Sequence, residues 1–102
     1  MKYRILRTDK ANDQLYSILQ YIAEDSGSID VALGVLDALE AEIRKLETTP
    51  HMGSYPRYCI LRKQGYRVLI VQRHLIFYKV DERREVVVYA IVDARQHYVN
   101  LI

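Results

Sequence analysis

The chain has 102 residues, half of them hydrophobic and 27% charged, and a formal net charge of +2. These values indicate one globular domain spanning residues 1–102 rather than a disordered chain. No apolar run approaches the ~20 residues that cross a bilayer, residues 1–10 carry no signal-peptide pattern, and the single cysteine, Cys59, cannot form an internal disulfide, so we expect a cytoplasmic protein with no membrane partner.

The first half of the chain predicts one strand and two helices. A short alternating segment, Lys2–Leu6, reads as a strand, and Thr8 or Asp9 can cap the helix that follows it. Apolar residues recur at helical spacing over Ala11–Ile22 and again over Ala32–Leu46. Two amphipathic helices joined by a short link form an αα-hairpin, and we expect its apolar stripe to face a sheet.

The second half of the chain predicts strands separated by short polar breaks. The expected strands are Tyr58–Leu61, Tyr66–Val71, Leu75–Val80 and Glu85–Val92. The tail after them has no clear period. The order β-α-α-β-β-β, with one further strand, predicts an α+β fold in which an N-terminal strand and the αα-hairpin pack on one face of a small antiparallel sheet.

The two central strands are apolar on both sides. Residues 68–71 are all apolar, as are residues 75–77, and three polar residues between the two runs predict an antiparallel hairpin. A strand that is apolar on both sides needs a cover on both faces. We expect so small a chain to lack a second cover, so the pattern implies a partner protein.

Basic residues concentrate in the second half. Residues 1–56 carry six Lys/Arg against nine Asp/Glu, and residues 57–102 carry nine against four. Ten of the fifteen basic residues are arginines, which pair with phosphate or carboxylate in a planar, bidentate manner. We expect Arg57, Arg62 and Arg73 to be surface charges or to contact a nucleic acid or a protein partner.

Several strings resemble the RelE/ParE superfamily of toxins from type II toxin–antitoxin systems. They run through nearly the whole chain: residues 18–22, residues 46–50 with Gly53, residues 61–67, residues 74–80, and Arg95 with Tyr98. The resemblance implies a protein that arrests growth when free and is silenced by a cognate antitoxin that wraps around it. Such an antitoxin fits the doubly apolar strands.

The resemblance leaves the target open. Some members cut messenger RNA in the ribosome, whereas the ParE branch poisons DNA gyrase without chemistry of its own. The long hairpin and residues 74–81 are more similar to the ParE branch, and residues 95–98 are more similar to a ribosome-dependent nuclease. We expect mRNA cleavage first and gyrase inhibition as the alternative, and a member that only binds its antitoxin remains a third reading.

Four residues are the catalytic candidates for metal-independent RNA cleavage. Such cleavage needs a base, an acid and cations around one phosphate. Arg67 matches the position at which nuclease members place a phosphate-binding arginine, and Arg95 can neutralise the same phosphate. His97 can act as general acid because imidazole titrates near neutral pH, and Tyr98 can act as base or stack on a nucleobase. The alternatives are a salt bridge for Arg67 and packing over the sheet for Tyr98.

No residue pattern indicates a cofactor or a metal. The three histidines lack metal-ligand spacing, and no phosphate-binding glycine loop or dinucleotide fingerprint is present. Cys59 lies in a predicted apolar strand, where we expect a buried, inert thiol.

Overall fold

A computed structural model describes residues 2–102. The N-terminal strand β1 (Arg4–Arg7) leads into α1 (Asp9–Ser26). The Oγ1 of Thr8 accepts a hydrogen bond from the Ala11 N–H at 3.1 Å and caps this helix, as predicted. Gly27, with a φ of 70°, ends it, because glycine adopts the left-handed conformation without steric cost.

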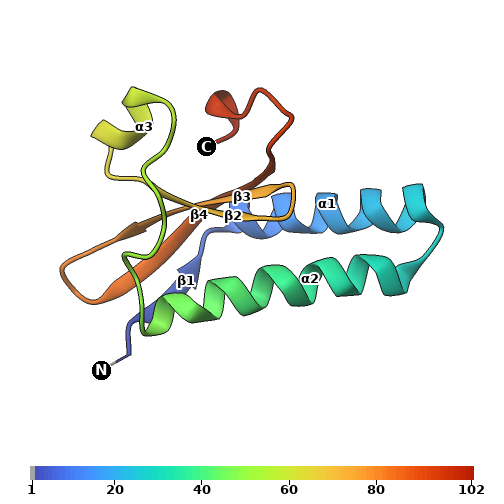
Figure 1. Cartoon of the computed structure of the whole chain (residues 1–102), viewed down its shortest axis with the longest axis horizontal. Helices are drawn as coiled ribbons and strands as arrows, with labels where there is room; N and C mark the ends of the chain where they lie inside the picture. The colour runs from blue at the N-terminus through green and yellow to red at the C-terminus, as the bar shows by residue number, and fades with distance from the viewer. Residues whose placement is uncertain (1) are drawn as a thin grey trace.

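The second helix completes the predicted αα-hairpin. Helix α2 (Ile29–Arg44) starts at Ser28, whose Oγ accepts from the Val31 N–H at 3.3 Å, and a short 3-10 turn, η1 (Lys45–Glu47), extends it. The two helices lie side by side on one side of the sheet (Figure 1). No helix in the described part of the chain is long and apolar enough to cross a membrane.

The expected strand at Tyr58–Leu61 is wrong, because these residues belong to a short helix. Helix α3 (Cys59–Lys63) follows Tyr58, and Gly65, with a φ of 90°, turns the chain out of it. Only Leu61 of this helix is buried. A short apolar run fits a strand or a helix equally by pattern. In the structure the run is helical, and its Leu61 side chain packs in the core on the second face of the sheet.

The sheet has four strands in the order β1-β4-β3-β2. Strands β2 (Arg67–Val71), β3 (His74–Val80) and β4 (Glu85–Asp93) are antiparallel neighbours, which confirms three predicted strands to within one residue at each end. Strand β1 pairs with β4 in parallel, so the sheet is mixed rather than antiparallel throughout. The α+β prediction is confirmed.

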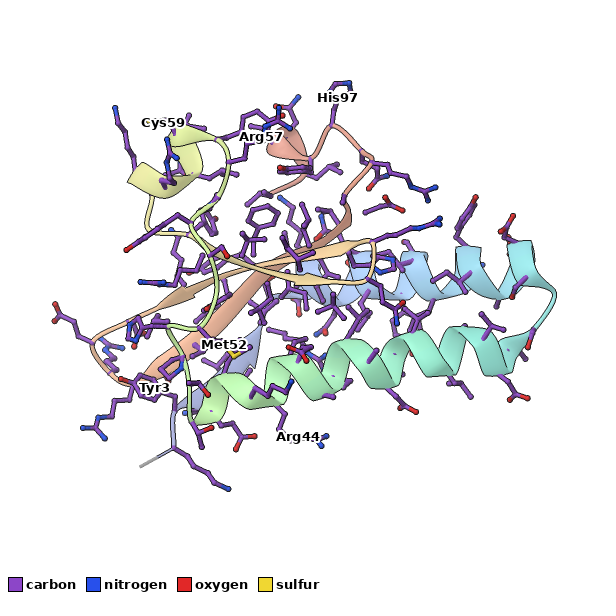
Figure 2. The ribbon with its side chains drawn as sticks, in the orientation of Figure 1. Tyr3, Arg44, Met52, Arg57, Cys59 and His97 are labelled. Atoms are coloured by element: carbon purple, nitrogen blue, oxygen red, sulfur yellow. The ribbon has the colours of Figure 1, made fainter. Side chains whose placement is uncertain are left out.

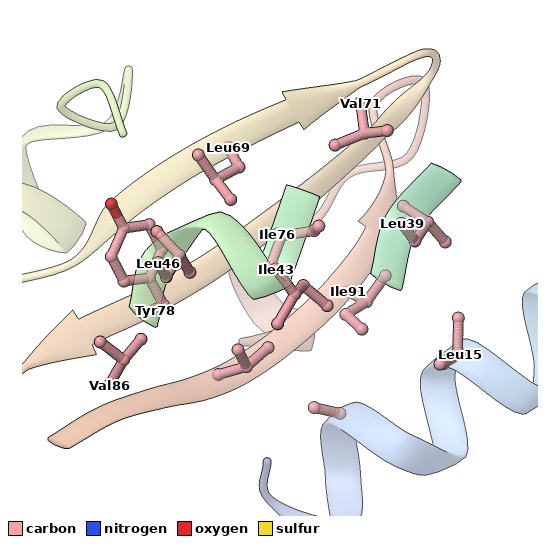
Figure 3. Packing of buried hydrophobic residues seen from close by; sticks show 12 residues of the cluster. Leu15, Leu39, Ile43, Leu46, Leu69, Val71, Ile76, Tyr78, Val86 and Ile91 are labelled. Carbon is pink, nitrogen blue, oxygen red and sulfur yellow. The ribbon is translucent and has the colours of Figure 1, made fainter. Parts of the chain in front are cut away.

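One core fills the space between the sheet and the helical hairpin. Its fully buried members include Leu39 and Leu46 from the helical side and Ile76, Tyr78 and Val86 from the sheet (Figure 3). These side chains alternate along their strands, as expected for one face of a sheet.

A second, smaller core covers the other face. Phe77 and Val92 of the sheet pack beneath Leu61 of α3 and beneath Tyr98 and Ile102 of the tail, whose last turn is η2 (Val99–Leu101). In Figure 1 this layer of α3 and the C-terminal segment lies across the sheet from the hairpin. The chain therefore supplies most of the second cover that we had assigned to a partner.

Candidate functional site

Arg67 is held by the loop that precedes α3. Its Nη1 donates hydrogen bonds to the carbonyl oxygens of His51 at 3.2 Å and Gly53 at 3.0 Å. Its guanidinium also lies 4.9 Å from the centre of the Tyr55 ring, a cation–π distance. Arg67 thus fastens a loop to the first residue of β2, and no carboxylate among the described residues neutralises it.

The same loop is fixed to the sheet at two further points. The Gly53 N–H donates to the Tyr78 Oη at 2.9 Å, and Ser54 exchanges two backbone hydrogen bonds of 2.9 Å with Val68. Burial raises the pKa of Tyr78, and the Gly53 hydrogen bond and the Arg67 charge partly oppose this shift. The Tyr78 hydroxyl is therefore a structural group that stays protonated at neutral pH.

Tyr98 lies on the opposite face of the sheet from Arg67. Its ring packs 5.4 Å from Phe77 and edge-to-face 5.5 Å from Tyr58, inside the second core. Arg67, by strand alternation, shares its face with Leu69 in the first core. The structure does not bring Arg67 and Tyr98 together.

Arg95 forms an ion pair at the far end of the sheet. Its Nε and Nη2 donate to the two carboxylate oxygens of Asp93 at 3.1 and 3.0 Å. These hydrogen bonds lower the pKa of Asp93 to about 2 and raise that of Arg95. Asp93 pairs across the sheet with His74, at the other end of β2 from Arg67, which separates the two arginines by roughly 13 Å along the strand direction.

The remaining candidates are exposed. His97 lies in the tail, away from the sheet surface (Figure 2), and makes no hydrogen bond or ion pair in the described structure. Arg57 lies just before α3, Arg62 lies within it, and Arg73 lies in the turn between β2 and β3. None of these three arginines forms an ion pair within residues 2–102.

A groove of about 1310 Å³ runs between α1 and the end of the sheet that carries Arg95. Ile18, Ile22 and Ile91 contribute apolar walls, and Arg73 and Arg95 are among the charged residues that line it. His74 also lines this groove. It is buried, its Nδ1 has no hydrogen-bond partner in the described structure, and burial lowers its pKa against the opposing effect of Asp93.

Comparison with known proteins gives the family. A family model described as the ParE toxin of the type II toxin–antitoxin system, parDE, matches residues 5–98. The chain belongs to this toxin family. No curated protein matches the sequence.

The fold of the toxin is similar to two solved structures. One is the chromosomal ParDE system of P. aeruginosa, with a TM-score of 0.76 and 16% identity over 92% of this chain and 98% of that one. The other is the RelBE2 toxin–antitoxin complex of Mycobacterium tuberculosis, with a TM-score of 0.58 and 13% identity over 91% of this chain and 99% of that one. Both confirm the RelE/ParE-like fold.

Sequence reasoning missed three features of the toxin's surface. His74 was read as part of a polar turn, yet it is the first residue of β3 and is buried. Tyr55, which Arg67 contacts, lies in a loop whose pattern gave no signal. The expected burial of Cys59 was wrong, because α3 exposes this residue. The prediction failed because the strand that was expected to bury the thiol is a helix in the structure.

Proposed function

We propose that the toxin arrests growth by binding DNA gyrase, without cutting RNA. The observation that carries this proposal is the position of Arg67 and Tyr98 on opposite faces of the sheet. Metal-free cleavage needs its acid, base and cation around one phosphate. Two of the four candidate residues cannot reach a common phosphate across a packed sheet, which favours action by surface contact.

The states of Arg67 and Arg95 support the same reading. The guanidinium of Arg95 is occupied by Asp93 through two hydrogen bonds, and that of Arg67 by two carbonyl oxygens. These partners already use part of the N–H donors of each arginine, so fewer remain for a phosphate. Membership of the ParE family agrees with a gyrase target, since that branch is the one expected to act without chemistry of its own.

His97 is the observation that favours the alternative, ribosome-dependent mRNA cleavage. The residue is exposed and makes no hydrogen bond, so its imidazole is free to approach an RNA. In that reading the toxin would act as an endoribonuclease on mRNA bound to the ribosome. Replacing His97 therefore distinguishes RNA cleavage from gyrase binding, and the exposed position means that the fold should be kept.

The test is a short induction in cells, with labelled thymidine and methionine incorporation followed side by side. We expect thymidine incorporation to fall first, and His97→Ala to remain as toxic as the control His51→Ala, which removes another exposed imidazole. Methionine incorporation that collapses first, with toxicity lost only in His97→Ala, would contradict the gyrase proposal. Either target places the toxin's action in the cytoplasm.

We further propose a cognate antitoxin that pairs with the open edge of β2. Both solved structures described above come from toxin–antitoxin systems. The backbone N–H and C=O of Val68 point away from β3 and are hydrogen-bonded to Ser54. The N–H and C=O of Ile70 point to the same side by strand alternation, and they have no backbone partner among the described residues. The Ile70 side chain is 68% exposed. An added strand would satisfy this edge and cover Ile70.

The antitoxin contact is tested by co-purification. A charge on an edge strand opposes the addition of another strand, so we expect Ile70→Lys to reduce recovery of the antitoxin with the toxin at least tenfold. The control is Tyr16→Lys, which places the same charge on α1 at a side chain that is 77% exposed. Equal recovery with both variants would show that the edge of β2 is not the contact.

A further inference from the structure

The groove between α1 and the end of the sheet contains a buried polar atom without a partner. His74, which lines this groove, is 7% exposed, and its Nδ1 makes no hydrogen bond to any described residue. Nearly all buried polar atoms in folded proteins are hydrogen-bonded, because an unpaired one lowers stability. The Nδ1 of His74 is therefore a contact point for a molecule that occupies the groove.

The groove has the size of a docking site for a folded segment. Its volume of about 1310 Å³ exceeds the roughly 300–1,000 Å³ of small-molecule pockets. Helices α1 and α2 extend beyond the end of the sheet that carries the turn between β2 and β3 (Figure 1). Ile18, Ile22 and Val35 of these helices line the groove and are only partly buried. The hairpin thus keeps an apolar strip of the kind on which an amphipathic helix packs.

The two walls of the groove carry opposite unpaired charges. Four charged residues that line it cancel in net charge as two pairs of opposite sign: Arg95 with Asp93, and Lys10 with Asp13. Asp25 at the end of α1 and Arg73 in the turn between β2 and β3 remain, both exposed and without an ion pair among residues 2–102. An occupant with a basic residue on one flank and an acidic residue on the other complements both walls.

The groove continues from the edge of β2, to which we assigned the antitoxin. Strand β2 ends at Val71, and the next two residues, Gln72 and Arg73, form the turn that lines the groove. A strand added beside Ile70 therefore ends close to the groove. One antitoxin chain can occupy both places without a long linker.

From this arrangement we propose that an amphipathic helix of the antitoxin fills the groove and hydrogen-bonds to the Nδ1 of His74. Its apolar residues face Ile18 and Ile22, a basic residue lies near Asp25, and an acidic residue lies near Arg73. The residue at His74 carries a hydroxyl or an amide, groups that serve either ring tautomer. This inference rests on the proposed antitoxin contact and adds a second site to it. His74 determines specificity, because an apolar residue at this place would leave the nitrogen unpaired in the complex.

The experiment compares His74→Leu with His74→Asn, using calorimetric titration of the full-length toxin with its purified cognate antitoxin and urea unfolding of the toxin alone. Leucine removes the unpaired nitrogen, so the free toxin should unfold at no lower urea concentration, while antitoxin binding weakens about tenfold. Asparagine places an amide near the position of Nδ1 and should keep the affinity within about threefold. A purely structural His74 would instead lower stability and affinity together in His74→Leu.

Charge reversals test the two walls of the groove. Asp25→Lys and Arg73→Glu should each weaken antitoxin binding about tenfold, because each places a like charge beside the bound helix. The matched controls are Glu24→Lys and Arg83→Glu, which make the same changes at exposed residues outside the groove and should bind as the native toxin does. Equal losses in the controls and in the groove variants would overturn the proposal.

The remaining outcomes separate this proposal from the edge contact and from the gyrase target. Loss of binding in Ile70→Lys with none in His74→Leu would overturn the groove and leave the edge contact standing; no loss in either would overturn both. A free toxin that is a dimer by light scattering and dissociates in Arg73→Glu would assign the groove to a second copy and overturn the proposal. Loss of gyrase binding in His74→Leu with the antitoxin affinity kept would assign the groove to gyrase and overturn it as well.

Discussion

Tyr98 shows how one side chain can look catalytic in the sequence and act as a packing group in the fold. Its ring contacts Phe77 and Tyr58, and no hydrogen bond to its hydroxyl group is found in the described structure. We expect Tyr98→Phe to keep both the free energy of unfolding and the toxicity, because only the hydroxyl is lost. Tyr98→Ala should lower the free energy of unfolding by about 1–2 kcal/mol, since the ring is only partly buried.

Urea unfolding and growth assays of the two Tyr98 variants check this prediction. A nuclease that uses the phenol as a base would lose toxicity in Tyr98→Phe with its stability unchanged. That combination would restore Tyr98 to the catalytic set and argue against the packing role.

The ion pair of Asp93 and Arg95 gives a pH-dependent contribution to stability. The pKa of Asp93 is about 2 in the folded chain, below its ordinary value of 3.8, because Arg95 donates hydrogen bonds to the carboxylate. A depressed carboxyl pKa stabilises the fold above pH 4, and this stabilisation is lost as the pH falls through about 2. Solvent screens the exposed Arg95, so we expect Asp93→Asn to cost about 1 kcal/mol at pH 7.

Urea unfolding of the native chain and of Asp93→Asn at pH 7, 3 and 2 measures this contribution. The difference between the two proteins should be largest at pH 7 and should shrink towards zero at pH 2. A difference that stays constant over this range would mean that the carboxylate charge does not contribute.

At the level of whole elements, hydrophobic period and capping residues predicted both long helices and three of the strands. Thr8 stands just before α1 and Pro50 follows the end of η1, so both mark ends of helical segments. The apolar runs of β2 and β3 are short, contain β-branched residues and are separated by a polar break, which favours two strands over a helix. Helix α3 could not be predicted in the same way. Only one residue of this helix, Leu61, is buried, and it is buried by contact with the sheet. A single tertiary contact of this kind produces no hydrophobic periodicity in the sequence.

The candidate site was less predictable than the fold, for a geometric reason. Whether two residues share a site depends on which face of the sheet each one occupies. A bulge in the pairing of β3 with β4 puts both Tyr89 and Ala90 on the second face, so strict alternation fails in β4. The path of the tail over that face, which buries the ring of Tyr98, follows from packing rather than from any motif.

The loop between η1 and α3 depends on a single glycine. A Cβ on Gly53 would lie 2.5 Å from the Tyr78 Oη and 2.9 Å from the Val68 carbonyl oxygen, both closer than packed atoms allow. We expect Gly53→Ala to lower the free energy of unfolding by about 2 kcal/mol, because the loop or the buried tyrosine must shift. Thermal unfolding followed by circular dichroism measures the effect.

Gly34 in α2 is the matched control for this substitution. A Cβ there meets nothing within 4 Å, and the residue is helical and exposed. Gly34→Ala should therefore stabilise the chain by about 0.5–1 kcal/mol through helix propensity. Equal and small effects at the two glycines would mean that the close approach of the loop to Tyr78 does not constrain the fold.

At the scale of the whole molecule, the toxin is a sheet with a core on each face. The larger core lies under the helical hairpin and the smaller one under α3 and the tail. Strand β3 contributes to both, with Ile76 and Tyr78 on one side and Leu75 and Phe77 on the other. Since the two cores share their central strands, neither can lose its packing without exposing a strand that the other also needs.

This sharing predicts one cooperative unfolding transition. We expect Leu39→Ala in the larger core and Leu61→Ala in the smaller one to cost about 3 kcal/mol each, because both side chains are almost completely buried. Both should shift the same urea transition, with far-ultraviolet circular dichroism and tyrosine fluorescence changing together. If Leu61→Ala instead released the tyrosine signal at lower urea while the helical signal stayed in place, α3 and the tail would be a cover that opens independently of the hairpin.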